Sequence, residues 1–166
     1  SGQTLTLDYQ DNKNGTAQLV IRGTSNGKTV NDTLVVTVNS VDDPPNVIAS
    51  NAPSDVTVDE DADNTIIDLS NVIDDVDNEN ANITFSFLSQ GDASIVALTL
   101  SGKTLTLDFQ ENQHTGQETM SIIYRATSNS LTVDDTIVVK VNPVDDTPTL
   151  ANAISDVTVN EEASNS

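Results

Sequence analysis

Apolar and polar residues alternate along most of this chain with a period of two. Thr104–Asp108 places leucine at every second position, Thr4–Asp8 repeats the same pattern, and Asn82–Phe87 places its apolar residues on one face. Because successive side chains of a strand point to opposite faces, this alternation predicts half-buried strands. Clusters of Gly, Asn, Asp and Pro separate these segments and indicate turns. No segment has the spacing of an amphipathic helix.

Between residues 46 and 147 the pattern predicts seven strands. They are expected at 54–59, 64–69, 82–88, 94–100, 103–109, 118–127 and 132–142. Seven strands in about 100 residues are typical of a Greek-key β-sandwich. The inward positions of these strands predict a core of Val56, Val58, Ile83, Phe85, Leu105, Leu107, Ile122, Tyr124, Ile137 and Val139.

Long segments of the chain recur. Asp55–Glu60 recurs at Asp156–Glu161, Val41–Pro45 recurs at Val144–Pro148, and the first ten residues match 101–110. A period of about 100 residues in which whole strands match indicates tandem copies of one domain. We therefore expect an all-β fold of tandem seven-stranded Greek-key β-sandwich repeats, the architecture of immunoglobulin domains.

The repeat predicts three parts. Residues 1–45 would be the C-terminal half of one copy, 46–147 a complete copy, and 148–166 the opening strand of the next. Prolines follow the last strand of each copy, at Pro44, Pro45 and Pro148. Proline stiffens the chain and donates no ladder hydrogen bond, so we expect short semi-rigid linkers and a rod of domains.

Acidic residues dominate the charge of the chain. There are 26 Asp and Glu against 6 Lys and Arg, a formal net charge of −20. Nucleic acid and anionic membrane surfaces would be repelled, so neither is an expected partner. The chain has no cysteine, so no disulfide can stabilise it. No stretch approaches the roughly 20 apolar residues of a membrane helix.

Separate acidic groups fall where a sandwich would place domain ends. They are the strand ends Asp8, Glu60 and Asp108, the linker pairs Asp42, Asp43, Asp145 and Asp146, and the loop residues Asp75 and Asp77. Clustered carboxylates repel one another unless a cation neutralises them, and a hard cation with many oxygen ligands suits them. Calcium is therefore the expected cofactor.

Each acidic group also has an interpretation without metal. The run Asp74–Glu79 can be a solvated loop, the linker pairs can be turn residues, and Asp8 and Asp108 can simply end strands. Glu60 stands among three aspartates, any of which could be a ligand instead. The loop is not an EF-hand, because Asn80 replaces the required glycine and Ser86 the final glutamate.

The order of these motifs resembles a known family. Leu-Asp-x-Gln, Val-x-x-Val-Asp-Asp-x-Pro, Val-x-Val-x-Glu and Asp-x-Asp are similar to the calcium-binding motifs of cadherin repeats. The whole copy more closely resembles the cadherin-like tandem repeats of giant bacterial surface adhesins, including the repeats-in-toxin class. The resemblance implies one calcium junction at Asp8, Asp42, Asp43, Asp75 and Asp77, and a second at Glu60, Asp108, Asp145 and Asp146. Two carboxylates of the cadherin pattern are absent, at Gln10 and Ser25 and again at Gln110 and Ser128.

Taken with this resemblance, the sequence suggests a calcium-stiffened spacer of a long bacterial adhesin, extracellular or on the bacterial cell surface. Its expected partners are neighbouring repeats of the same chain. The alternative is a cadherin-like module that binds polysaccharide or like domains on another cell. No enzyme is expected, because the single histidine, His114, has no evident nucleophile or orienting group. With aromatic residues at 3% and all on predicted strands, sugar stacking has little support.

Overall fold

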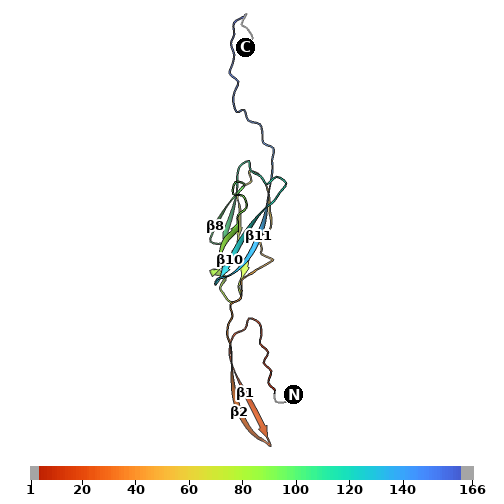
Figure 1. Ribbon diagram of the computed structural model, residues 1–166, viewed down its shortest axis with the longest axis vertical. Coiled ribbons are helices and arrows are strands. Elements are labelled where there is room, and N and C mark those ends of the chain that lie inside the picture. Colours follow the sequence, from red (N-terminus) through yellow and green to blue (C-terminus); the bar gives the residue numbers. More distant parts are fainter. Residues whose placement is uncertain (1–3, 162–166) are drawn as a thin grey trace.

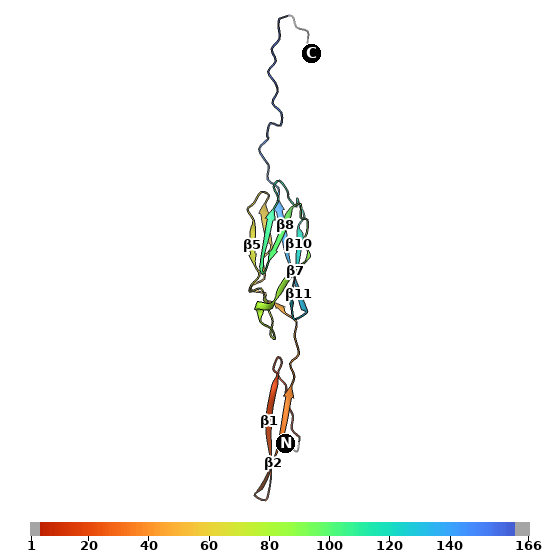
Figure 2. The same cartoon turned by 90° about the vertical axis from the view of Figure 1, so that its left-hand side faces the viewer.

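The computed structural model describes residues 4–161. They form a β-hairpin, a β-sandwich and an extended C-terminal segment, arranged end to end (Figures 1 and 2). The hairpin consists of β1 (Gly15–Ser25) and β2 (Lys28–Val38). In the described part of the chain the only helical element is the single turn η1 (Asn80–Asn82), and no helix is long and apolar enough to span a membrane.

The sandwich has two principal sheets. One has the order β4-β11-β10-β7 and the other β5-β9-β8. Their strands are β4 (Val56–Asp59), β5 (Thr65–Asp68), β7 (Thr84–Ser89), β8 (Val96–Ser101), β9 (Thr104–Phe109), β10 (Met120–Ser128) and β11 (Leu131–Asn142). All seven strands predicted by the alternation are confirmed, and the all-β sandwich is confirmed with them.

A further pair of two-residue strands lies beside the sandwich. β3 (Asn46–Val47) pairs with β6 (Ile73–Asp74) in antiparallel register. The alternation did not predict this pair, because two residues are too few to show a period.

The first strand of the sandwich lies beside the last. β4 pairs in parallel with β11, from Val56 opposite Val139 to Asp59 opposite Asn142, whereas every other pairing among residues 4–161 is antiparallel. The backbone N–H of Val138 also donates to Asp55 Oδ1 at 2.9 Å, which fixes the start of β4. The parallel pair closes the larger sheet with residues more than 80 positions apart in sequence.

The core lies between the two sheets. Seven of the ten predicted core residues are buried, and Val56, Val58 and Phe85 are half-buried against them. The structure adds Leu69, Val72, Ile73, Val96, Phe109, Ala126 and Val141. Several of these lie in loops or at strand ends, where no alternation marks an inward position. Tyr124 is 1% exposed, and its hydroxyl donates to Asp135 Oδ2 at 2.7 Å.

The β1–β2 hairpin repeats the β10–β11 hairpin in the same register. Arg22 lies opposite Asn31, as Arg125 lies opposite Asp134. The two turns also match, because Asn26-Gly27 and Asn129-Ser130 all have positive φ, as a two-residue type I′ hairpin turn requires. The sequence repeat is therefore a repeat of structure in these two hairpins.

Two expected strands are not formed. Thr4–Asp8 has no strand partner, although the matching segment Thr104–Asp108 lies in β9 between β5 and β8. The predicted opening strand of the third copy, at 156–161, is extended and unpaired, whereas the matching segment forms β4 against β11. A strand needs a partner for its backbone groups, and among residues 4–161 no strand pairs with either segment.

Candidate functional site

Pairing of β3 with β6 brings an acidic linker beside an acidic loop. The linker Val41–Pro45 precedes β3, and the loop Asp75–Glu79 follows β6. Pro45 is buried, and Ile48 N donates to the carbonyl oxygen of Val72 at 2.7 Å, which holds the two segments together. Two runs of aspartate, distant in sequence, therefore meet at the end of the sandwich that faces the β1–β2 hairpin (Figures 1 and 2).

Hydrogen bonds join the linker to the loop directly. The backbone N–H of Asp43 donates to Asp77 Oδ2 at 2.8 Å. Asn78 Nδ2 donates to Asp42 Oδ1 at 2.7 Å and to Asp75 Oδ1 at 3.3 Å, so one amide bridges both carboxylates. Four predicted metal ligands therefore lie together at this first junction.

The tip of the β10–β11 hairpin reaches the same place. Asn129 Nδ2 donates to Asp42 Oδ2 at 2.9 Å, so Asp42 is held from two sides. Sequence reasoning missed Asn129 and Asn78, because a neutral amide carries no charge pattern. Two segments of chain, the loop and the hairpin tip, thus converge on Asp42 of the linker.

Asp75 is the most enclosed carboxylate of the first junction, at 6% exposed. Burial alone would raise its pKa, but the Ser128 hydroxyl and the N–H groups of Asp77 and Asn78 favour the charged form and hold the pKa of Asp75 below its ordinary value. Both N–H groups donate to Asp75 Oδ1 at 2.9 Å. Buried Ser128 Oγ makes no hydrogen bond of normal geometry among the described residues, although it lies close enough to Asp75 to act on it.

The carboxylates of the first junction are near one another but do not form a finished metal cage. Among residues 4–161, no three Asp, Glu or His side chains converge closely enough to hold a metal ion. The donor set nevertheless fits a hard cation, since it consists of carboxylates and amides, and Asp75 is held in its charged form. The groups are assembled by hydrogen bonds through Asn78.

Asp8 is not part of the first junction. It is exposed, accepts only a long hydrogen bond of 3.4 Å from Gln10, and borders a hollow over the hairpin with Leu7 and Tyr9. Asp11, three residues later, instead lines a hollow with Asp43 and Asp77. The structure therefore brings Asp11 toward the linker in place of Asp8.

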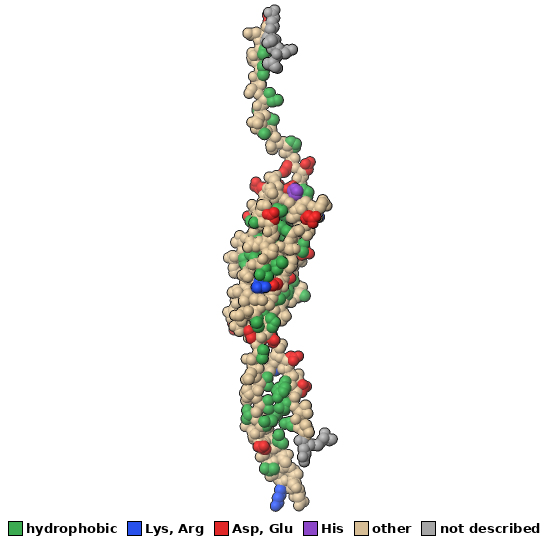
Figure 3. Space-filling model, viewed as in Figure 1, with side chains coloured by type: hydrophobic (Ala, Val, Ile, Leu, Met, Phe, Trp, Pro, Cys, Tyr) green, Lys and Arg blue, Asp and Glu red, His purple; other side chains and the backbone are tan. Residues whose placement is uncertain are grey.

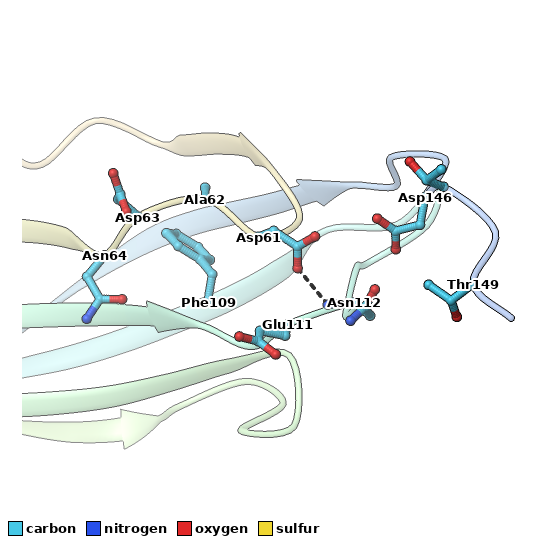
Figure 4. A pocket seen from close by; sticks show the side chains of 10 residues that line it. Asp61, Ala62, Asp63, Asn64, Phe109, Glu111, Asn112, Asp146 and Thr149 are labelled. Atoms are coloured by element: carbon cyan, nitrogen blue, oxygen red, sulfur yellow. Dashed lines mark hydrogen bonds between the residues drawn. The ribbon is translucent and has the colours of Figure 1, made fainter. Parts of the chain in front are cut away.

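The predicted ligands of the second junction lie at the opposite end of the sandwich. Glu60 is 8% exposed, and its Oε1 accepts the N–H of Val144 at 2.6 Å. Asp146 borders an open hollow that Figure 4 shows from close by. Asp145 and Asp108 are both exposed, and neither lines that hollow.

Three further acids line the same hollow as Asp146: Asp61 and Asp63, which the sequence left open as alternatives to Glu60, and Glu111, which it did not indicate. Asp61, Asp63 and Glu111 surround Phe109, and Asp61 Oδ1 accepts the N–H of Asn112 at 2.8 Å (Figure 4). Glu111 matches Asp11 in the repeat, as Asp146 matches Asp43. Both ends therefore place the acid three positions after Asp8 or Asp108 near the linker. The alignment of the two copies already showed an acid at this position in both, at Asp11 and Glu111.

Little positive charge opposes these acids. Among residues 4–161 the one ion pair joins Arg125 Nε and Asp134 Oδ1 at 2.7 Å on an exposed face. The guanidinium lowers the pKa of Asp134, and the carboxylate raises that of Arg125. Figure 3 shows Asp and Glu side chains at both ends of the sandwich.

Comparison with known proteins yields structural likeness alone. No protein-family model matches the sequence, and no curated protein matches it. A structure of protocadherin gamma B7 extracellular cadherin domains 1–4 aligns with a TM-score of 0.53 and 20% identity, covering 83% of this chain and 34% of that chain. Human protocadherin-24 EC1-2 aligns with a TM-score of 0.49 and 13% identity, covering 85% and 70%.

A likeness of lower TM-score extends to an enzyme. The endo-fucoidan hydrolase MfFcnA4 aligns with a TM-score of 0.43 and 18% identity over 83% of this chain and 20% of its own length. This chain therefore spans about a fifth of that hydrolase and a third of the protocadherin. At these identities the likeness concerns the fold. The chain has a cadherin-like β-sandwich fold.

Proposed function

We propose that this chain is a calcium-stiffened structural spacer of the tandem-repeat kind found in long bacterial surface adhesins. The observation that carries the proposal is the linker clasped by its neighbouring domain, through Asp43 N to Asp77 and through Asn78 to Asp42 and Asp75. A linker held in this way transmits the orientation of one domain to the next. The work of the chain is then mechanical, holding a binding domain away from the cell.

Calcium would strengthen this clasp. Asp42, Asp43, Asp75 and Asp77 supply carboxylate oxygens, and Asp11 lies on the hairpin side of the same linker. The Asn78 amide, which now donates to two carboxylates, can turn its oxygen toward a cation instead. At the far end, Glu60, Asp61, Glu111 and Asp146 offer the matching groups.

A metal that binds only the folded state raises stability by mass action. The gain is about 1.4 kcal/mol at ten times the dissociation constant and about 2.7 kcal/mol at a hundred times. Extracellular calcium modules bind at roughly 10⁻⁴ to 10⁻³ M, so millimolar calcium should suffice. The location that follows is outside the cell, on the bacterial surface.

The test compares melting and solution scattering of the whole chain in calcium and in chelator. We expect calcium to raise the melting temperature and to narrow the range of angles between hairpin and sandwich. Asp77→Asn should weaken both responses. Asp92→Asn is the matched control, because it removes the same charge from a loop carboxylate that contacts Ser94, outside the first junction. Equal melting and scattering with and without calcium would defeat the proposal.

Polysaccharide binding, the alternative, has weaker support. Of the five aromatic side chains, Phe109 and Tyr124 are buried and Phe85 and Phe87 half-buried, so only Tyr9, at 60% exposed, could stack on a sugar. Nor do we propose an enzyme. His114 lies in a loop, where its Nδ1 accepts the N–H of Gly116 at 3.1 Å.

A further inference from the structure

Asp42 of the linker is held by side-chain amides from two separate parts of the sandwich. Asn129 Nδ2, at the tip of the β10–β11 hairpin, donates to Asp42 Oδ2 at 2.9 Å, although the two residues are 87 positions apart. Asn78 Nδ2, in the loop after β6, donates to Asp42 Oδ1 at 2.7 Å. Each carboxylate oxygen of Asp42 therefore accepts a hydrogen bond from a neutral donor.

No basic side chain takes part in this arrangement. Among residues 4–161 the one ion pair joins Arg125 to Asp134, and no lysine or arginine forms an ion pair with Asp42. Amide N–H groups that donate to a carboxylate make charge-assisted hydrogen bonds, which are shorter and stronger than bonds between neutral groups. The linker carboxylate is thus bound to the sandwich by these two amides.

The hairpin tip presents the Asn129 amide from a fixed position. Asn129, with a φ of 43°, and Ser130, with a φ of 75°, form the two-residue turn, and the neighbouring Ser128 is paired with Leu131 and is 2% exposed. Asparagine tolerates the left-handed backbone that such a turn needs. The amide is therefore one residue beyond a buried position of the larger sheet, and the β10–β11 register sets its reach to the linker.

The Asn78 amide is anchored from the loop side. Its backbone N–H donates to Asp75 Oδ1 at 2.9 Å, and its side chain also reaches that oxygen at 3.3 Å. Asp75 is 6% exposed, so it ties Asn78 to the interior of the sandwich. Asp42 consequently lies between two amides that are fixed to the sandwich independently of each other.

The hydrogen bond beside Asp42 shows what the two amides position. Asp43 N donates to Asp77 Oδ2 at 2.8 Å. Because Asp43 adjoins Asp42 in the chain, this bond persists only while the linker lies against the loop. The Asp43 N–H therefore reports whether the linker is in place.

We propose that Asn129 is a positioning residue, which with Asn78 forms an amide latch that holds the linker at Asp42 even when no metal ion is bound. Calcium then adds to a linker that already has its orientation, so less conformational freedom is lost when the ion binds. If Asn78 turns its oxygen to the ion, Asn129 is the amide that remains on Asp42. The latch does not depend on the proposed calcium function, but its effect on calcium affinity does.

The first test measures hydrogen exchange of the Asp43 N–H by NMR, in the whole chain and in chelator. Asn129→Gly and Asn129→Asp both accept a positive φ, but neither has a side-chain N–H to donate. We expect exchange to be about fivefold faster in Asn129→Gly, the ratio that corresponds to about 1 kcal/mol for a lost hydrogen bond. Asn129→Asp should exchange faster still, because its carboxylate repels that of Asp42.

Asn26→Gly is the matched control. Asn26 occupies the corresponding turn of the β1–β2 hairpin with a φ of 48°, and this turn lies at the end of that hairpin far from the linker (Figures 1 and 2). This variant should leave the exchange of the Asp43 N–H unchanged. The amides of β10 and β11 should keep their protection in Asn129→Gly, which verifies that the turn and the sheet are intact.

A double-mutant cycle ties the effect to Asp42. Asp42→Ala removes the acceptor, so adding Asn129→Gly should accelerate the exchange of the Asp43 N–H no further. Unchanged exchange in both Asn129 variants would overturn the proposal. So would additive effects of Asp42→Ala and Asn129→Gly, or an equal acceleration in Asn26→Gly.

The second test separates the latch from the proposed calcium function. Calcium titration by calorimetry compares the original chain with Asn129→Gly. Loss of a group that orients a metal ligand weakens metal affinity by about 10–100-fold, and for this single amide we expect about tenfold. An original chain that bound no calcium would defeat the proposed function and leave the latch to be judged by the exchange of the Asp43 N–H. Equal calcium affinities in the two proteins would refute the role of Asn129 in preparing the site.

Discussion

Asp75 shows how a buried carboxylate can be stable at the end of an acidic domain. It is 6% exposed, yet the N–H groups of Asp77 and Asn78 and the Ser128 hydroxyl keep it charged. Because its folded-state pKa lies below the ordinary value of 3.8, Asp75 adds stability that is complete above that pH and lost as the pH falls below it. The free energy of unfolding should therefore decrease at low pH, in part because Asp75 becomes protonated.

The substitution Asp75→Asn tests this link. Its amide oxygen can still accept both N–H groups, but no charge remains to titrate. We expect the original chain to lose more free energy of unfolding than the variant as the pH falls below 3.8. Denaturant titration at several pH values in chelator provides the measurement, and parallel losses in both proteins would contradict it. The comparison cancels the general relief of repulsion that acid gives to a chain of net charge −20.

At the level of single residues, the sequence indicated part of the site. The linker aspartates and the Asp75–Asp77 loop were expected to meet, and contacts now join them. Asp8 was expected there too, but it ends a segment that has no partner strand, whereas Asp11 sits in the following turn beside Asn12. The alternation indicates where a strand would end, but it does not show which residue of the following turn lies near the linker. Metal binding by any of these residues stays a prediction.

At the level of elements, alternation was sufficient for strands that have partners. It predicted Thr104–Phe109 and Thr4–Asp8 equally, but only the first lies between two other strands. Periodicity describes the face that a strand would bury, and it says nothing about which partner is present. The strands β3 and β6 show the opposite case. They pair with each other, but each is too short to show an alternation in the sequence.

At the end of the β4–β11 pair, the backbone N–H and the side chain of Glu60 both bond to the end of β11 or to the chain that follows it. The sequence analysis considered Glu60 only as a metal ligand. Glu60 N donates to the carbonyl oxygen of Asn142 at 2.9 Å, and Glu60 Oε1 accepts from Val144 N at 2.6 Å. Hydrogen bonds to charged groups contribute about 1.5–3 kcal/mol. We therefore expect Glu60→Ala to lower the free energy of unfolding by about 2 kcal/mol.

Glu60→Gln is the matched control for that prediction. It keeps an oxygen acceptor of the same reach and should lose clearly less stability than Glu60→Ala. Chemical denaturation in chelator measures both, which keeps any metal at Glu60 out of the comparison. If both variants lost the same amount, the side-chain hydrogen bond would not be the cause.

At the level of the whole molecule, charge is the dominant property. A net charge of −20 with one ion pair among residues 4–161 leaves most carboxylates without a cationic partner. Salt screens such repulsion, so sodium chloride should raise the melting temperature of the chain in chelator. Calcium chloride at equal ionic strength should raise it further, because coordination adds to screening. If the melting curves in the two salts coincided, calcium would act on this chain by charge screening alone and not by coordination.

The parallel contact of β4 with β11 also decides how the sandwich responds to tension. A pull along the chain enters at the beginning of β4 and leaves at the end of β11, so the two strands are drawn in opposite directions past each other. Their four paired positions, Val56–Asp59 against Val139–Asn142, are then loaded in shear and resist together. A strand peeled from one end would give way one bond at a time. Shear loading therefore gives the sandwich a higher resistance to unfolding under tension, which suits a tether exposed to flow.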